Sequence, residues 1–446
     1  MKQGTAKILK WIAGVVLALA LAYVVLQIYA GRVLQNVYAA LEADGRPMKI
    51  EQIIPSEIPD ADNAALVYEA VVLKLKAEKL GEESIFEKLA GLAEEILGHA
   101  EETLDENSSE RARKEFWELS QTDTVSKALD DLQKGTAKPG CRFNLDYSKG
   151  FEMGFGPFRE LMNLSQVLCA FALGQVEDGN ETASWDAAVS ALRFADALRD
   201  EPLLISQLVR GTQFSEAVEA IHELTKNSLP TKPQFELLGR SLNGFDTINP
   251  LVASLDGERL LMAEPAFSDL KALALGLAEL DKSAMDRLGM SFHLYSPLLK
   301  LDHATYLNFV RESTDLFAQP YSLNDRVFEN ERIENLPWYA LLTAIVTPSF
   351  YQAKVAGVSM IAKARITRAG LAVLKHKEEN GAYPEKLSGL GEGEWIDPFT
   401  GKPLIYKTTP TGFTLYSLGE NQVDDNGSEE GLQKEHKGDV VWRYPK

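Results

Sequence analysis

Cysteine is nearly missing from this chain of 446 residues, and so are the motifs of the common enzymes. Cys141 and Cys169 are the only two cysteines, which is too few for a disulfide framework or a Cys-x-x-Cys metal site. The six histidines stand singly, and the segment closest to a His-Glu-x-x-His zinc motif, starting at His222, has Lys226 in place of the second ligand. Neither a Gly-x-Ser-x-Gly turn nor a phosphate-binding Walker loop occurs. The sequence therefore names no catalytic residue and predicts a protein that is not an enzyme.

The state of the two cysteines is left open by the sequence. Cys141 lies in a Pro-Gly turn and Cys169 in an apolar helical run, so the two could meet, and an oxidising exported compartment would permit a disulfide. A pair of free thiols with at least one buried is the alternative, because free cysteine is commonly buried.

Positive charge is also scarce. The chain has 46 Lys and Arg residues against 65 Asp and Glu residues, which gives a net charge of −19. Nucleic acid requires clustered basic side chains, and anionic lipid headgroups repel an acidic surface. We therefore predict no nucleic-acid partner, and we interpret the acidic runs as solvated helix faces that aid solubility.

One long apolar run is present, from Trp11 to Ala30, and Gln27 is its only strongly polar member. As a helix these residues would span about 30 Å, the thickness of a bilayer's hydrocarbon core. Three lysines and no acidic residue precede the run, which favours a cytoplasmic N-terminus. We predict residues 1–10 in the cytoplasm, a single transmembrane anchor at 11–30 in the inner (cytoplasmic) membrane, and an extracytoplasmic remainder.

A cleaved signal peptide is the alternative reading of this run. Ala18-Leu19-Ala20 and Ala20-Leu21-Ala22 both resemble cleavage sites. The apolar run continues for eight residues beyond Ala22, to Ala30, without a polar stretch, which favours the uncleaved anchor.

Apolar residues recur with a period near 3.6 through most of the following chain, which predicts helices. Residues 31–62 should form a juxtamembrane helix and linker, and residues 63–335 an extracytoplasmic helical domain. Two helical hairpins suggest an array that resembles a tetratricopeptide-type solenoid in outline, although no 34-residue repeat is present. Residues 318–335 are rich in Asn and acidic residues and predict a surface loop or a domain boundary. The expected helices are 64–80, 84–104, 108–134, 158–177, 182–199, 202–227, 231–243, 250–263, 266–281 and 302–317.

The last part, residues 336–446, changes pattern. A helical block with a break near Thr347-Pro348 ends in a helix of about 30 residues, which stops at Asn380-Gly381-Ala382-Tyr383-Pro384. Asp397-Pro398 then starts a turn, and alternating residues predict strands near 403–408, 412–417 and 439–443. We predict a mainly α protein with a small C-terminal α+β domain, and strands only in the last 60 residues.

This order of elements from about residue 350 resembles the C-terminal half of the major pseudopilins of type II secretion. The resemblance implies an antiparallel sheet packed on a long helix that ends at the Gly-x-Tyr-Pro corner. It also implies a calcium site in the loop after the Ser417-Leu418-Gly419 strand, with four ligands in this sequence: Leu418 through its carbonyl, and Asp424, Asp425 and Asp439. Calcium takes oxygen ligands of this kind. An insertion from Glu429 to Gly438 departs from the pseudopilin pattern, and an ordinary solvated acidic loop is the alternative.

A second departure concerns the N-terminus. Pseudopilins have a Gly cleavage site and a Glu five residues into the mature chain, and neither Gly4 nor Gly14 is followed by such a Glu. The sequence therefore favours a membrane-anchored scaffolding or interaction protein of the bacterial envelope. The two alternatives are a component or modulator of a type II secretion or pilus-like machine, and an enzyme whose site no motif reveals.

Overall fold

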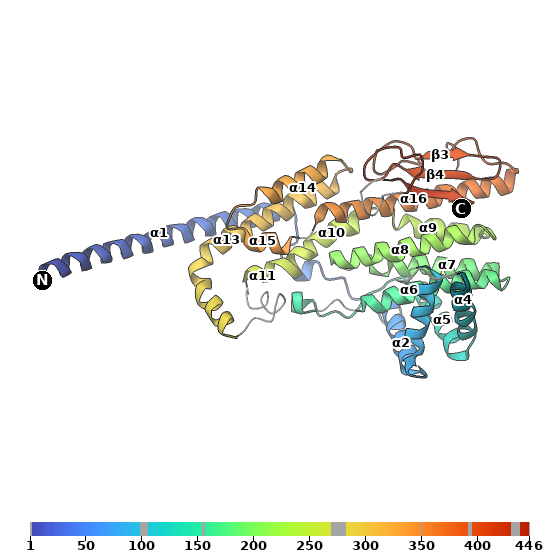
Figure 1. The fold of residues 1–446 in the computed structure, drawn as a ribbon, viewed down its shortest axis with the longest axis horizontal. Helices are drawn as coiled ribbons and strands as arrows, with labels where there is room; N and C mark the ends of the chain where they lie inside the picture. The colour runs from blue at the N-terminus through green and yellow to red at the C-terminus, as the bar shows by residue number, and fades with distance from the viewer. Residues whose placement is uncertain are drawn as a thin grey trace.

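The computed structural model describes residues 2–98, 106–153, 157–268, 282–347, 349–390, 395–429 and 438–445. Within them the protein is mainly helical, with one long apolar helix at the N-terminus and a small three-stranded sheet at the C-terminus (Figure 1). This confirms the predicted mainly α class with a small C-terminal sheet. The likeness to pseudopilins stays a prediction.

The N-terminal helix α1 (Lys2–Ala43) continues without a break from the apolar run into the juxtamembrane segment. Its apolar part is exposed and is long and apolar enough to cross a membrane. Farther along the same helix, Val37 and Leu41 are buried in a core that also contains residues of α13 (Lys282–Ala318). The helix ends before Gly45, whose φ of 71° favours glycine. The predicted anchor and the juxtamembrane helix thus form one continuous helix, and its N-terminal part projects from the body (Figure 1).

Four helices form a lobe beneath the main bundle: α2 (Ala64–Ala77), α3 (Ile85–Ile96), α4 (Glu106–Ser120) and α5 (Asp123–Thr136). The prediction of one helix over 108–134 was wrong, because the chain breaks between α4 and α5. There the hydroxyls of Ser120 and Thr122 donate to the carbonyls of Trp117 and Leu119, each at 2.7 Å. Such local bonds compete with the helical backbone pattern.

The prediction that strands occur only in the last 60 residues was also wrong. Helix α2 ends three residues earlier than expected, and a short antiparallel hairpin follows, β1 (Lys79–Leu80) with β2 (Glu83–Ser84). Gly81 makes the tight turn possible with a φ of 73°. Ser84 then caps α3 by accepting a hydrogen bond from Glu87 N, which fixes the start of that helix.

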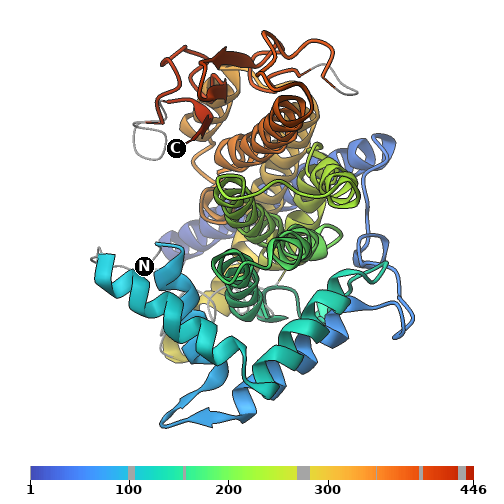
Figure 2. The ribbon, with the colours of Figure 1, turned by 90° about the vertical axis from the view of Figure 1, so that its right-hand side faces the viewer.

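The central bundle agrees closely with the predicted helices. Helices α6, α7 and α8 pack against one another, and α9 packs on α7 and α16. Figure 2 looks down the bundle, with the sheet above it and the α2–α5 lobe below. The lobe crosses the bundle at a steep angle in Figure 1. The bundle helices are α6 (Phe158–Glu177), α7 (Glu181–Ala195), α8 (Leu204–Leu224), α9 (Lys232–Asn243) and α16 (Phe350–Asn380).

The chain between α9 and α16 departs most from the prediction. The expected loop at 318–335 contains α14 (Asn324–Glu334), and α13 begins 20 residues before the predicted start at 302. Helix α14 is held by tertiary contacts, since its buried Asp325 pairs with Lys354 of α16 at 2.8 Å. The remaining elements are α10 (Asn249–Gly257), the π-helical turn η4 (Glu258–Ala263), α11 (Glu264–Ser268) and α15 (Leu341–Val346). Most of the helix expected at 266–281 lies outside the described residues.

Helix α16 joins the bundle to the C-terminal sheet. Its buried residues contact α8 and α9 on one side and the sheet on the other. The antiparallel order is β3 (Ile405–Thr408), β4 (Phe413–Ser417) and β5 (Val440–Tyr444). Close approach of sheet to helix requires Gly370, because a Cβ there would overlap the ring of Trp442. One continuous core contains residues of the α2–α9 helices, α16 and the sheet, so it crosses the predicted boundary at 335.

The corner after α16 is the predicted one. Gly381 has a φ of 75° and ends the helix, and the centroid of the partly buried Tyr383 ring lies 6.1 Å from that of Phe413.

Because the Tyr383 ring is only partly buried, we expect Tyr383→Ala to cost about 1–3 kcal/mol of unfolding free energy, below the range for a fully buried aromatic residue. Thermal unfolding of the full chain in detergent micelles measures this cost. A loss below about 0.5 kcal/mol, typical of a surface substitution, would show that the corner does not need the ring.

Candidate functional site

The acidic loop that the sequence singles out begins where two tyrosines hold it against the helices. Tyr351 of α16 donates its hydroxyl hydrogen to Oε1 of Glu420 at 2.7 Å. Tyr321, which precedes α14, donates to the Glu420 carbonyl oxygen at 2.8 Å. All three residues are buried. The start of the loop is therefore part of the folded interior.

Asp397 fixes the other side of the loop entrance. Its carboxylate accepts hydrogen bonds from the backbone N–H of Phe399 at 2.9 Å, the hydroxyl of Ser417 at 2.7 Å and the backbone N–H of Leu418 at 3.1 Å. The side chain is 2% exposed. The turn predicted at Asp397-Pro398 is present, and it clamps Leu418, the predicted carbonyl ligand, at the end of β4.

The three predicted aspartates lie in the same loop region, and each accepts hydrogen bonds from its neighbours. Asp424 accepts from the Tyr416 hydroxyl at 2.9 Å, and Asp425 from the backbone N–H of Gly438 at 3.1 Å. Asp439 accepts from the backbone N–H of Gly427 at 2.7 Å. These bonds tie the described parts of the loop to one another and to β4.

Among the carboxylates of the predicted ligands, Asp439 has a buried oxygen without a hydrogen-bond partner in the described structure. The residue is fully buried, and its Oδ1 has no hydrogen-bond partner. Burial raises the pKa of this carboxyl group, and the charges of Asp425 and Asp424 raise it further. No group of three His, Cys, Asp or Glu side chains converges on a metal position among the described residues, which omit 430–437 of this loop. The unpaired Oδ1 of Asp439 could accept a cation, and the charges of Asp424 and Asp425 act on the same carboxyl group. In the described part of the loop the three carboxylates do not converge on one metal position.

A larger feature, which the sequence did not indicate, is a cavity of about 640 Å³ between α8 and α16. Gly211 and Thr212 of α8 face Gly357 and Met360 of α16 across it, and Met162 of α6 is also part of its wall. A Cβ at Gly211 would meet no atom within 4 Å, so this residue leaves space on the α8 side, whereas Gly357 packs closely against Leu251. The size of the cavity is within the range of small-molecule sites.

A serine and a lysine meet at the wall of this cavity. Lys363 Nζ donates to Ser215 Oγ at 3.0 Å, and Ser215 Oγ donates in turn to the Gly211 carbonyl at 3.0 Å. Burial lowers the pKa of the Lys363 ammonium group. A lysine of lowered pKa beside a hydroxyl can accept a proton or hold an anionic group. The serine proton is committed to a helix carbonyl, so the pair is better placed for binding than for nucleophilic attack.

Gln207 and Arg210 add buried polar groups to the same wall. The Gln207 amide nitrogen donates to the carbonyls of Leu198, Arg199 and Glu201, while its Oε1 is buried without a partner. Such an acceptor is costly unless water or a ligand donates to it. Residues that line this cavity thus include one with a buried, unpaired acceptor and one with a cation.

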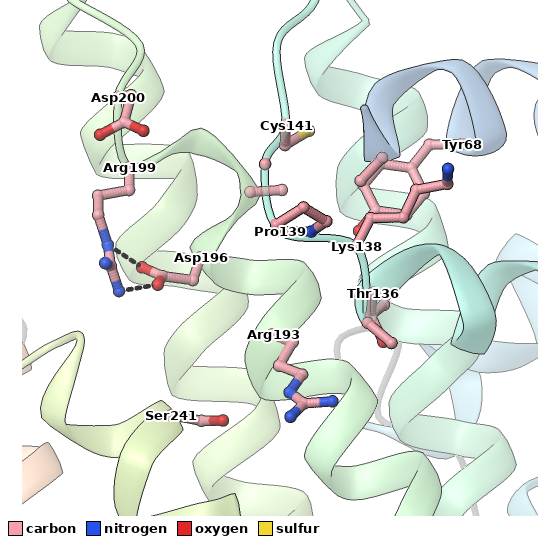
Figure 3. Close-up of a pocket in the computed structure, with 14 residues that line it drawn as sticks. Tyr68, Thr136, Lys138, Pro139, Cys141, Arg193, Asp196, Arg199, Asp200 and Ser241 are labelled. Atoms are coloured by element: carbon pink, nitrogen blue, oxygen red, sulfur yellow. Dashed lines mark hydrogen bonds and ion pairs between the residues drawn. The ribbon is translucent and has the colours of Figure 1, made fainter. Parts of the chain in front are cut away.

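A second, smaller cavity of about 290 Å³ lies between the α2–α5 lobe and α7 (Figure 3). Figure 3 shows Arg199 paired with Asp196 on one wall and Tyr68 with Cys141 on the other. Asp196 Oδ1 also accepts from Arg210 Nη2 at 2.7 Å, so one carboxylate joins this wall to the wall of the larger cavity. Burial, aided by the charge of Glu201, raises the Cys141 pKa to about 12, which leaves the thiol unreactive.

The structure also shows the state of the two cysteines and the surroundings of two histidines. Cys141 and Cys169 are free thiols, so the disulfide is absent and the alternative holds. His222 stacks on Trp442 with ring centroids 4.0 Å apart and lies 3.1 Å from the Thr367 hydroxyl. His303 packs against Phe267, and burial lowers its pKa to about 4. Both are packed side chains.

Comparison with known proteins gives no relative from which a role could be transferred. No family model matches the chain. No curated protein matches it. No solved structure matches it either, so the role must be argued from the residues described above.

Proposed function

We propose that this chain is a membrane-anchored extracytoplasmic protein of the bacterial envelope, with a scaffolding or protein-interaction role. The main support is that α1 runs without a break from the apolar run into the body of the protein. The apolar part of this helix is uncovered, and the same helix then becomes part of the core through Val37 and Leu41. An anchor that is also a core helix holds the body rigidly, whereas a flexible linker would let it drift.

Ion pairs at the end of α1 support this rigid attachment. Arg46 Nη2 lies 2.8 Å from Asp315 Oδ1 of α13 and Arg46 Nη1 lies 3.8 Å from Asp256 of α10. Asp44 pairs with Arg311, also of α13. Two helices of the body thus hold the chain where α1 ends.

The topology is tested with reporters fused after Lys446. A reporter that is active only in the exported compartment should be active, and one that works only in the cytoplasm should be silent. The intact mass of the membrane-extracted protein should include residues 1–30, because the anchor is uncleaved. Cytoplasmic activity would overturn the topology, and a chain that begins near Ala20 or Ala22 would establish the signal peptide instead.

Two other roles have distinct signatures. Crosslinking in intact cells should identify envelope proteins; recovery of type II secretion or pilus components would instead favour the modulator role. The α8–α16 cavity, with Lys363 beside Ser215, is the observation that favours an enzyme. Glu258, whose pKa burial raises to about 6, lies outside this cavity, and we place the enzyme third.

We also propose calcium as the ion of the loop after Leu418. Asp424, Asp425 and Asp439 would supply carboxylate oxygens and Leu418 its carbonyl oxygen. Calcium accepts this mixed oxygen set, while magnesium demands octahedral geometry and keeps its water. The buried Oδ1 of Asp439 is the observation in favour.

The full chain in detergent micelles should melt at a higher temperature in millimolar calcium than in chelator. Binding to the folded state alone adds roughly 2.7 kcal/mol at a hundredfold excess over Kd. Magnesium should raise the melting temperature less, and Asp439→Asn should abolish the calcium effect. Identical melting in calcium and chelator would leave the solvated acidic loop as the correct interpretation.

A further inference from the structure

Exposed apolar side chains outside α1 are concentrated in one segment. Among the described residues, six of the eleven large hydrophobic side chains that are exposed beyond α1 lie between positions 323 and 345. Three of them, Trp338, Leu341 and Ile345, are the most exposed of the six, at 77%, 68% and 56%. Leu341 and Ile345 are four residues apart and therefore share one side of α15, while Trp338 lies in the turn that precedes the helix. We call these three side chains the α15 face.

Helix α15 is apolar on both sides. Leu342 and Val346 pack against the core formed by α1, α10 and α13, while Leu341, Ala344 and Ile345 are exposed. A helix that is apolar all round is stable only where both sides are covered. The inner side is covered by the body, so the outer side requires a second apolar partner.

The position of α15 along α1 identifies that partner. The Asp302 carboxylate accepts the backbone N–H groups of Leu342 at 2.8 Å and Thr343 at 3.1 Å, which fixes α15 to α13. Lys300, half a turn away on α13, donates to Gln27 of α1 at 2.9 Å.

His303, the residue after Asp302 on α13, packs edge to face with Tyr38 of α1, with ring centroids 5.8 Å apart. Gln27 and Tyr38 bracket Ala30, where the apolar run of α1 ends. Figure 1 likewise places α15 at the end of the body from which α1 emerges. The α15 face therefore lies at the level where α1 would leave the bilayer.

We propose that the α15 face lies in the boundary between headgroups and acyl chains of the bilayer that α1 crosses. This inference rests on the proposed anchoring. Tryptophan and tyrosine favour this boundary, and Trp338 is followed by Tyr339, with the two rings edge to face at 5.8 Å. The acidic chain would be repelled by anionic headgroups, so the contact is apolar and suits zwitterionic lipid. Anchor and face together hold the body against the membrane at two points.

Site-specific fluorescence in the full chain tests the contact. Leu341→Cys carries an environment-sensitive dye in phosphatidylcholine vesicles, with nitroxide quenchers placed shallow or deep on the lipid chains. Leu73→Cys on α2 is the matched control, because Leu73 is 70% exposed and lies in the lobe away from α1. Leu19→Cys in the apolar run reports anchoring. The unsubstituted chain gives the background from Cys141 and Cys169.

The dye at 341 should emit at a shorter wavelength than the dye at 73. It should be quenched more by the shallow nitroxide than by the deep one, while the dye at 73 should be quenched by neither. Ile345→Cys, on the same face, should reproduce the result if the first variant folds poorly. Quenching at 19 without quenching at 341 and 345 would overturn this inference and leave the anchor intact. Absence of quenching at 19 would overturn the anchor itself. A wavelength shift at 341 that depends on protein concentration and not on lipid nitroxide would assign the face to a second copy.

Discussion

Asp325→Ala should destabilise the full chain by about 3–5 kcal/mol, the cost of leaving one member of a buried ion pair alone. Lys354 Nζ lies 2.8 Å from Asp325 Oδ2, and the two side chains are 1% and 3% exposed. Lys354 also donates to the Leu316 carbonyl at 2.7 Å, so its ammonium group is held in place after the carboxylate is removed. Thermal and urea unfolding in micelles measure the loss, which should appear first as detachment of α14 from α16.

An exposed pair on α5 provides the matched control. Lys134 and Asp130 are 72% and 58% exposed and stand four residues apart. Asp130→Ala should cost far less than Asp325→Ala, because solvent screens exposed pairs. Replacing both Lys354 and Asp325 with apolar residues should restore much of the stability lost by Asp325→Ala alone. Equal, small losses at positions 325 and 130 would show that the pair is open to solvent.

Trp442→Ala should cost about 3–5 kcal/mol, within the range for buried aromatic residues. The indole is 3% exposed, stacks on His222 of α8 with rings 5° from parallel, and meets Phe413 of β4 at 5.5 Å. It joins the sheet to both α16 and α8. Unfolding of the variant, with limited proteolysis near β5, should show the sheet released from the bundle. An unchanged melting temperature would contradict this role.

A double-mutant cycle with Gly370 separates packing from general damage. Gly370→Ala alone should be destabilising, because the new Cβ would overlap the Trp442 ring. Once the indole is removed, the methyl group has room, so the double variant should lose less than the sum of the single variants. Strict additivity would mean that α16 and the sheet can move apart without cost.

The sequence predicted elements well where local chemistry decides them. Helix α6 was predicted with its observed ends, and Gly381-Ala382-Tyr383-Pro384 ends α16 as expected. The loop prediction for 318–335 was wrong because α14 depends on Asp325 and Glu329, whose partners Lys354 and Tyr351 lie on α16. Nothing within the segment announces those contacts.

The candidate sites show the same contrast. Asp424 and Asp425 are neighbours in sequence, and the resemblance to pseudopilins added Asp439, so their shared loop was predictable. Lys363 and Ser215 stand 148 residues apart on different helices, and neither lies in a motif. Their meeting depends on how α8 packs on α16, which the periodicity of each helix does not specify.

Because α1 is one unbroken helix, it fixes both the rotation of the body around the helix axis and the distance of the body from the apolar run. An α-helix turns by about 100° and rises by 1.5 Å for each residue. The side of α1 that faces a given direction in the apolar run therefore determines the direction in which the sheet and both cavities point. One residue inserted before Gln27 would swing the body by about 100° around the helix axis relative to anything that holds the first half of α1. Two partners, one gripping the helix inside the bilayer and one docked on the body, would then be in phase only at the natural spacing.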